Sequence, residues 1–360
     1  MPVVRRPAAR TSAVRTLTAR TFAATAAFAL AGALTSCAAF APVDSVTVYT
    51  ADGLRNTEGT GWLDQVFADF EAETGVTVQY VEGGSGEIVQ RAARERANPQ
   101  ADVIITLPPF IQQADGMGLL QEYEPEGSEH VGTRAPEGRW TAIVNNYFCL
   151  TYNTEELEEP PTTWEDLLDP RFESRLQYST PGVAGDGTAV LIQAMHAFGG
   201  LEPATEYLGE LQANNVGPSS STGALGPKVD KGELLVANGD VQMNVAQSRT
   251  MPNLGIWFPA REGGRPTTFA LPYTAGLVTD APQPEHGRAL LDFMLSEAAQ
   301  GQVVPVAGGF PARTDVPVEG EGAEELEALM EGVEVFEPDW KEIDANLPEY
   351  LDAWREATGG

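Results

Sequence analysis

Apolar runs rich in β-branched residues alternate with amphipathic stretches along the chain from residue 45 onward. The apolar runs predict strands at Val46–Thr50, Val76–Glu82, Ala101–Leu107, Trp140–Asn153, Leu176–Thr180, Leu234–Asn238, Leu254–Pro259 and Thr268–Thr279. Apolar positions spaced three and four apart predict helices at Trp62–Thr74, Gly86–Ala97, Thr163–Leu168, Thr188–Phe198, Glu202–Asn214 and Glu285–Leu295. This alternation of strands and helices favours an α/β fold with mostly parallel sheets.

Two of the predicted strands, 140–153 and 268–279, are unusually long. A body of about 315 residues exceeds what one compact core usually holds, so we expect two lobes, with these segments crossing between them. Residues 45–142 and 262–303 would form lobe 1, and residues 143–261 and 304–360 would form lobe 2.

Glycines and hydroxyl side chains gather where predicted strands end, at 49–53, 82–86, 106–109, 179–188 and 218–223. Ligands of such sheets bind at the carboxyl ends of strands. The stretch Gly185-Asp186-Gly187-Thr188 opens a helix, where free N–H groups favour an anion such as a phosphate or phosphonate. Plain N-capping by Thr188 or Asp186 explains it equally well. Likewise, residues 218–223 offer four hydroxyls or only a capped turn.

The first 37 residues resemble a bacterial lipoprotein signal. Residues 1–20 contain five arginines and no acid, residues 21–34 are apolar, and Leu34-Thr35-Ser36-Cys37 resembles a lipobox. The resemblance implies diacylation of Cys37 as the mature N-terminus, followed by a linker at 38–44. The alternatives are an ordinary signal peptide or an uncleaved anchor.

The charge excludes one class of partner. Without the five signal arginines, 17 basic residues face 52 acidic ones, a net charge of −35, so nucleic acid is not a partner. Only Cys149 remains as a thiol, and no Cys/His cluster suggests a metal site. No GxSxG, HExxH or nucleotide-binding glycine motif is present, so we expect neither an enzyme nor a cofactor.

At these loops the chain resembles a known family. The segments VTVYTADGL, QYVEGGSGEIV, NPQADVIITLPPFIQ, LQYSTPGVAGDGTAV, LQANNVGPSSSTGAL, VANGDVQMNVAQ, ALPYTAGLV and GGFPARTDV together resemble the 2-aminoethylphosphonate-binding proteins of bacterial phosphonate importers. The likeness runs from about residue 46 to 340. It implies the two-lobed, type 2 periplasmic-binding-protein fold, near the ferric-iron-binding branch, with the ligand between the lobes.

That branch supplies the main competing ligand. By alignment, the tyrosine pair of the ferric-binding relatives falls near Gln242-Met243 and their glutamate near Leu107. Fe(III) prefers phenolate and carboxylate oxygens, which these side chains lack, so the sequence disfavours iron.

The resemblance also implies which residues bind 2-aminoethylphosphonate. We expect the phosphonate to contact hydroxyls and helix starts, at Ser179, Thr180, Gly187, Thr188, Ser221 and Thr222. The ammonium needs carboxylates or aromatic faces, so we expect that side of the pocket among Tyr49, Asp52, Glu82, Ser85, Leu107, Asp240 and Tyr273, with Asp52 and Asp240 preferred. Each of these could instead have a structural role, Asp52 and Asp240 in turns and both tyrosines in the core.

The resemblance finally implies a mechanism. The lobes would close over the ligand, and the closed form would deliver it to an ABC transporter permease. The protein would be a monomer held by its lipid anchor at the outer face of the cell membrane. The remaining alternatives are a binding protein for ferric iron, a phosphate ester or a polyamine, and a lipoprotein enzyme.

Overall fold

The computed structural model describes residues 44–56 and 58–359. Cys37, the predicted signal and most of the predicted linker lie outside the described residues. Among the described residues, no helix combines the length and apolar character needed to cross a bilayer.

A six-stranded sheet is built from both ends of the chain, in the order β11-β4-β10-β3-β1-β2. Its strands are β1 (Ser45–Ala51), β2 (Thr77–Gly83), β3 (Val103–Thr106), β4 (Thr141–Asn145), β10 (Tyr273–Leu277) and β11 (Phe310–Pro311). β1 pairs in parallel with β2 and β3, whereas β10 and β11 pair antiparallel. The middle strands are buried on both sides, which explains their continuous apolar runs.

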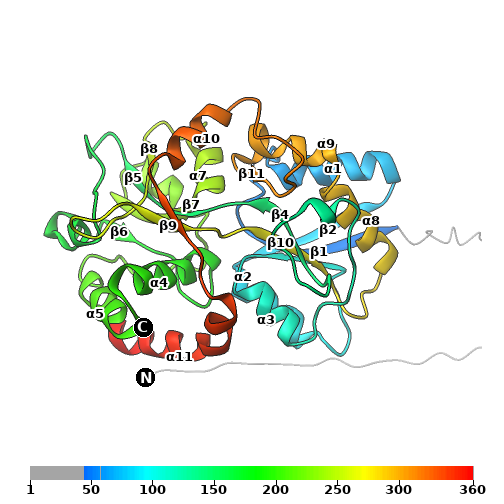
Figure 1. The fold of residues 1–360 in the computed structure, drawn as a ribbon, viewed down its shortest axis with the longest axis horizontal. Helices are drawn as coiled ribbons and strands as arrows, with labels where there is room; N and C mark the ends of the chain where they lie inside the picture. The colour runs from blue at the N-terminus through cyan, green and yellow to red at the C-terminus, as the bar shows by residue number, and fades with distance from the viewer. Residues whose placement is uncertain (1–43, 57, 360) are drawn as a thin grey trace, which may run out of the picture. The chain divides into compact units, whose positions relative to one another are not determined.

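Helices cover both faces of this sheet (Figure 1). α1 (Trp62–Thr74) and α8 (Pro284–Met294) lie on one face, and α2 (Ser85–Arg94) and α3 (Phe110–Gly116) on the other. In α1, Trp62, Val66 and Phe70 recur at a spacing of four and are buried against the sheet. The helix ends at Gly75, whose φ of 74° is the left-handed conformation that glycine adopts without strain.

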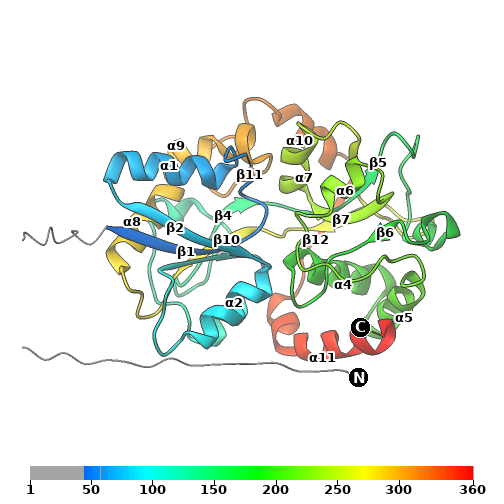
Figure 2. The same ribbon diagram turned by 180° about the vertical axis from the view of Figure 1, so that it is seen from behind.

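A four-stranded sheet has the order β6-β7-β5-β8. It consists of β5 (Phe148–Asn153), β6 (Leu176–Gln177), β7 (Val236–Asp240) and β8 (Leu254–Trp257). α4 (Gly185–Phe198) and α5 (Leu201–Leu211) lie on one side of it, and α6 (Gly226–Asp230) and α7 (Val241–Ser248) on the other (Figure 2). A separate pair, β9 (Thr267–Phe269) and β12 (Glu334–Phe336), runs parallel beside α4.

The remaining elements are short, except for the last helix. They are α9 (Glu297–Gly301), α10 (Ala323–Met330), α11 (Trp340–Thr358), the 3₁₀ turns η1 (Ser128–His130), η2 (Glu165–Leu168) and η3 (Pro170–Phe172), and the π-helical turn η4 (Val303–Ala307). α11 packs against α5 and also contacts α3. It therefore touches helices that belong to both sheets.

The predicted α/β class is confirmed, but the sheets are mixed rather than mostly parallel. β10 and β11 run opposite to the other four strands of the six-stranded sheet, which makes three of its five pairings antiparallel. The predicted strand 140–153 is two strands, β4 and β5, separated by Asn146 and Tyr147 and belonging to different sheets. The predicted strand 268–279 divides in the same way into β9 and β10.

The division into lobes stays a prediction, and two segments differ from the boundaries given above. β11 pairs with β4 in the six-stranded sheet, although residues 304–360 were expected with the other lobe. β9 pairs with β12, away from the sheet to which residues 262–303 were expected to belong. Both differences arise because strand pairing, which brings distant segments together, is not encoded in local periodicity.

Candidate functional site

A cleft of about 1050 Å³ lies where loops of the two sheets face each other. It is lined by the segment after β1, the start of α2, residues 220–227, α7 and residues 305–307. Asp52, Gly53, Ser221 and Gln242 belong to this lining. Behind them is a buried group of polar side chains that the following hydrogen bonds connect to the cleft.

Asp52 joins the two sides of the cleft. Its Oδ2 accepts a hydrogen bond from the Ser221 hydroxyl at 2.6 Å and another from the Gly223 N–H at 3.2 Å. Burial nevertheless raises the pKa of Asp52 above its usual value, because these donors offset only part of the lost hydration. The carboxyl is therefore a bridge between the β1–α1 loop and the loop before α6.

Asp240 and Tyr273 lie next to it. Asp240 caps α7 by accepting the Met243 N–H at 2.7 Å, and the Tyr273 hydroxyl lies 3.2 Å from the other Asp240 oxygen. The same hydroxyl is 3.1 Å from the Asp52 carbonyl oxygen. Burial raises the pKa of Asp240 to about 6 and that of the Tyr273 hydroxyl above its usual value.

Gly53 allows this close packing. Its φ of 119° suits glycine, and a β-carbon there would collide with the Tyr273 hydroxyl. Gly53 thus lets the loop after β1 lie directly over Tyr273.

A third carboxyl, Asp186, is the second residue of α4 and only 3% exposed. Its Oδ1 has no hydrogen-bond partner within the described chain. Burial, together with the nearby Asp240 and Asp52 carboxyls, raises the pKa of Asp186 well above its usual value. Three buried carboxyls therefore face one small region, and none of the ion pairs found among the described residues includes any of them.

Hydroxyl groups gather beside these carboxyls. Ser179 Oγ lies 2.8 Å from Thr222 Oγ1, and both side chains are buried. The Asn238 amide fixes Ser179, accepting its N–H at 2.8 Å and donating to its hydroxyl at 3.1 Å. Asn238 of β7 therefore fixes the position of this hydroxyl pair.

The N-termini of α2 and α4 meet at this point. A β-carbon added to Gly185 would lie 2.7 Å from Ser85 Oγ and 2.8 Å from Leu107 Cδ1. The Gly86 N–H donates to the Val183 carbonyl at 2.9 Å. Ser85 Oγ is buried and has no hydrogen-bond partner within the described residues. First-turn N–H groups have no partner within their own helix, so two sets of donors and two positive helix ends face this region.

The structure brings most of the predicted site residues together. Those that lie in or beside the buried polar group are Asp52, Ser85, Leu107, Ser179, Ser221, Thr222, Asp240 and Tyr273. Gly187 is close by, where a β-carbon would strike the Ser179 carbonyl. Glu82 is at the exposed margin of the cleft, 3.2 Å from Arg55.

Two predicted residues use their hydroxyls in hydrogen bonds to the backbone of the loops before α4 and α6. Thr188 Oγ1 accepts the Gly182 N–H at 2.9 Å and donates to the Ala184 carbonyl at 3.1 Å. Thr180 Oγ1 accepts the Ser219 N–H at 3.2 Å. Both residues therefore shape the loops around the site through contacts within the chain.

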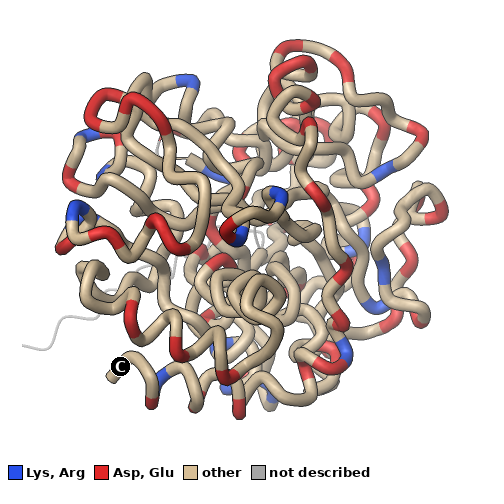
Figure 3. Tube along the Cα trace, turned by 60° about the vertical axis from the view of Figure 1, so that its left-hand side comes forward, with Lys and Arg blue, Asp and Glu red and all other residues tan. Residues whose placement is uncertain are grey.

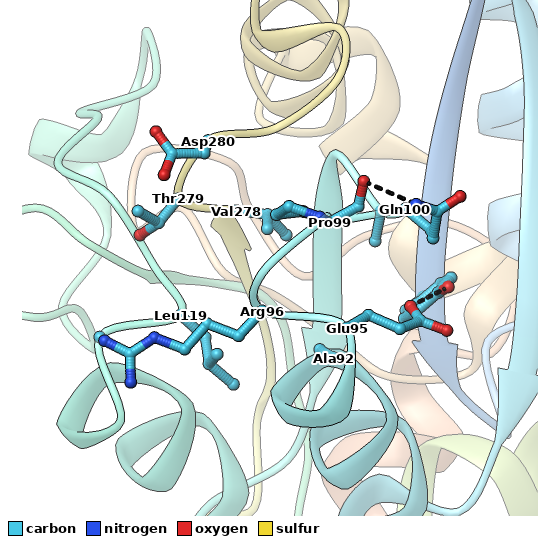
Figure 4. Close-up of a pocket in the computed structure, with 12 residues that line it drawn as sticks. Ala92, Glu95, Arg96, Pro99, Gln100, Leu119, Val278, Thr279 and Asp280 are labelled. Atoms are coloured by element: carbon cyan, nitrogen blue, oxygen red, sulfur yellow. Dashed lines mark hydrogen bonds between the residues drawn. The ribbon is translucent and has the colours of Figure 1, made fainter.

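Tyr49 lies elsewhere. Its hydroxyl donates to Glu95 Oε2 at 2.6 Å, and it lines a separate small pocket of about 120 Å³ at the end of α2. Figure 4 shows Ala92, Glu95 and Arg96 in this pocket, with Leu119 and Asp280 on neighbouring segments. The Tyr49 side chain points to the α2 face of the sheet, so we leave it out of the site.

Sequence reasoning missed Asp186 and Gln242. Asp186 appeared there only as a possible helix cap, although an acid between two glycines at a helix start was a usable signal. Gln242 donates to the Ala307 carbonyl at 2.7 Å, and its Oε1 has no hydrogen-bond partner among the described residues. Within that part of the chain, no group of three or more His, Cys, Asp or Glu side chains could hold a metal ion.

The fold and the interlobe cleft define a class of ligand-binding protein. Residues 56–301 match the family described as bacterial extracellular solute-binding protein. The chain belongs to this family, and its fold is that of the type 2 periplasmic binding proteins.

Particular relatives narrow the comparison. The chain is 45% identical over 315 residues to the "Putative 2-aminoethylphosphonate-binding periplasmic protein" of Salmonella paratyphi A, covering 87% of this chain and 92% of that one. It is 27% identical to Iron uptake protein A1 of Synechocystis, covering 72% and 76%. Among solved structures, the periplasmic binding protein AfuA of Actinobacillus pleuropneumoniae, with fructose-6-phosphate bound, has a TM-score of 0.75 at 18% identity, covering 88% of this chain and 99% of that one.

Proposed function

We propose that this protein is the extracytoplasmic solute-binding lipoprotein of an ABC importer, that it binds 2-aminoethylphosphonate or a similar small phosphonate, and that it delivers this ligand to the permease. It performs no covalent chemistry and acts as a monomer anchored through Cys37. The observation that supports this most strongly is the buried group of carboxyls and hydroxyls, which suits a ligand with a cationic and an anionic end. The 45% identical Salmonella relative supports the choice of ligand.

The ammonium end of the ligand fits the carboxyl side of the site. Tyr273 lies between the Asp52 backbone carbonyl and the Asp240 carboxyl, and among the described residues no lysine or arginine forms an ion pair with either aspartate. A buried carboxylate without a cation is costly, and an ammonium from the ligand would offset that cost. The Tyr273 hydroxyl ties the Asp240 carboxyl to the backbone of the loop that carries Asp52.

The phosphonate end fits the donor side of the site. Ser85, Ser179 and Thr222 bring hydroxyls, and the starts of α2 and α4 bring N–H groups and the positive ends of two helix dipoles. In this proposal Thr180, Thr188 and Gly187 keep the loop before α4 in the conformation that exposes these donors.

Closure of the cleft would bury the ligand. Two contacts join the opposing loops, from Asp52 to Ser221 and from the Gly86 N–H to the Val183 carbonyl. Such contacts can form only when the two sides approach, so they favour the closed conformation that a permease would recognise.

Isothermal calorimetry of the purified protein with 2-aminoethylphosphonate tests the proposal, with inorganic phosphate and ferric citrate as controls. We expect one-to-one binding of the phosphonate and no binding of either control, because phosphate lacks an ammonium and the site offers iron a single tyrosine, Tyr273, whose hydroxyl is kept protonated by burial beside Asp240. Heat from a control but none from the phosphonate would leave a solute-binding protein and exclude this ligand.

A further inference from the structure

Asp186 differs from the other two buried carboxyls in its hydrogen bonds. Asp52 Oδ2 receives two donors, and Asp240 receives one N–H and the Tyr273 hydroxyl. Asp186 Oδ1 receives none within the described chain, although the residue is only 3% exposed. Burying an ionised carboxylate oxygen without a hydrogen-bond donor costs free energy. A protonated carboxyl at the same place avoids this cost and can itself donate a hydrogen bond.

The Asp52 and Asp240 carboxyls, together with burial, oppose the ionisation of Asp186. Asp52 faces it from the loop after β1, Asp240 from the β7–α7 junction, Tyr273 from β10 and the Cys149 thiol from β5. None of these brings a positive charge. A ligand ammonium shared with Asp52 and Asp240 balances at most one of three carboxylates.

Of the three buried carboxyls, Asp186 is therefore the one that retains a proton at the lowest cost in free energy. Hydrogen-bond donors to Asp52 and Asp240 offset part of the cost of burying their charge, whereas burial and those two carboxyls raise the pKa of Asp186 well above its usual value. The only favourable influences on its charge are its own N–H, the Thr222 hydroxyl and the start of α4.

We propose that Asp186 stays protonated in the ligand-bound protein and donates its carboxyl hydrogen to an oxygen of the phosphonate. This inference rests on the proposed function, because it concerns the anionic end of the same ligand. Asp186 then takes the role that an arginine or lysine fills in many anion sites, without adding charge to a site that, in the proposed function, also binds an ammonium.

Two substitutions distinguish this role from an ionised partner of the ammonium. Asp186→Asn keeps a neutral donor of the same shape, and Asp186→Ala removes the donor. Measured by calorimetry with 2-aminoethylphosphonate, we expect the Ala variant to bind about 10- to 100-fold more weakly than the wild type, and the Asn variant to recover most of that loss. If Asn binds as weakly as Ala, the donor role is wrong.

A pH series separates a donor from a merely structural side chain. Raising the pH ionises Asp186 in the wild type but not in the Asn variant, so the affinity of the wild type should fall relative to that of the variant as the pH rises. The titration of the ligand itself is common to both proteins and cancels in the ratio. A ratio that is constant or rises with pH would overturn the inference.

The two failures are distinguishable. Absence of binding by the wild type would overturn the proposed function and this inference with it. Binding by the wild type with an Asn variant as weak as Ala would overturn only the role of Asp186. Thermal unfolding of each variant at each pH confirms that folded protein is compared.

Discussion

At the scale of single residues, Asp240 has two roles that conflict. It caps α7 through the Met243 N–H, and it is fully buried beside two other carboxyls. The capping needs only an oxygen acceptor, whereas the charge is useful only to a cationic ligand. Under the proposed function, the charge of Asp240 lowers the stability of the ligand-free protein and contributes to binding of the ligand ammonium.

Asp240→Asn should show this conflict. The folded pKa of about 6 lies above the unfolded value of about 3.9, so the folded protein holds the extra proton between these values, and stability falls as the pH rises from about 4 to about 6. Above about pH 6 the ionised Asp240 carboxylate destabilises the folded protein by the full amount. The Asn variant carries no charge to bury and keeps an oxygen that can cap α7. Its free energy of unfolding at neutral pH should therefore exceed that of the wild type by about 2 to 3 kcal/mol.

Urea unfolding of both proteins at neutral pH and near pH 4 measures the difference. We expect the gain at neutral pH to shrink at the lower pH, with weaker binding of 2-aminoethylphosphonate by the variant. Equal stability of the two proteins at neutral pH would show that Asp240 is not strained by its charge.

At the scale of elements, α11 connects parts of the chain that are distant in sequence. Trp354 is 7% exposed and donates from Nε1 to the Tyr178 hydroxyl at 3.1 Å. Leu351 packs on Gly182, where a β-carbon would lie 2.8 Å from Leu351 Cδ1. The helix thus supports the loop between β6 and α4, which holds the start of α4 in place.

Trp354→Ala should lower the free energy of unfolding by about 3 to 5 kcal/mol, because it removes a large buried side chain and leaves a cavity beside Tyr178. Arg355→Ala is the matched control: its exposed side chain forms an ion pair only within α11, so its effect should stay below about 1 kcal/mol. Chemical denaturation of both variants measures the two effects. A loss of unfolding free energy below about 1 kcal/mol for Trp354→Ala would mean that α11 does not stabilise the loop between β6 and α4.

The same elements show what local sequence could predict. The predicted helix 62–74 is confirmed, because its apolar spacing and its flanking glycines are all local signals. α11 was missed although Ile343, Leu347, Tyr350 and Trp354 follow helical spacing, since Pro348 and many acids obscure the pattern. α7 was missed because its first five residues are all buried, so no polar face marks its period.

The site shows the same limit. The loops were found because glycines and hydroxyls follow predicted strand ends. Which side chains of β1 point toward the site was harder to predict. Tyr49 and Thr50 are both buried, so the pattern of apolar and polar residues does not show which face of the sheet carries α2. The partnerless oxygen of Asp186 depends on packing between segments that are distant in sequence, so no local pattern encodes it.

At the scale of the whole molecule, acidic residues greatly outnumber basic ones, 52 against 22, and they are spread over many elements (Figure 3). Such a field repels anions at long range, so a ligand with its own positive charge is favoured over a bare anion. In the proposed mechanism, closure rests on local contacts across the cleft, of which the Asp52 bridge to Ser221 and Gly223 is the clearest.

Asp52→Ala should prevent this closure. We expect small-angle X-ray scattering to show a smaller radius of gyration for the wild type with 2-aminoethylphosphonate than without it, and little change for the variant. The affinity of the variant should fall by about tenfold or more, because a charged hydrogen-bond acceptor is lost. An equal contraction in both proteins would mean that other contacts drive closure.

The glycines at the two facing helix starts have a consequence for how such a protein can change over evolution. An added methyl group would meet backbone atoms at Gly86 and Gly187, and the Ser85 and Leu107 side chains at Gly185. At these helix starts the proposed site therefore has dimensions that are set largely by the main chain. Its chemistry rests on side chains such as Ser85, Thr222 and Asp186, which can be exchanged without moving the backbone. A descendant protein could accept a different head group of the same size through one such exchange, whereas a bulkier ligand would require rebuilt loops.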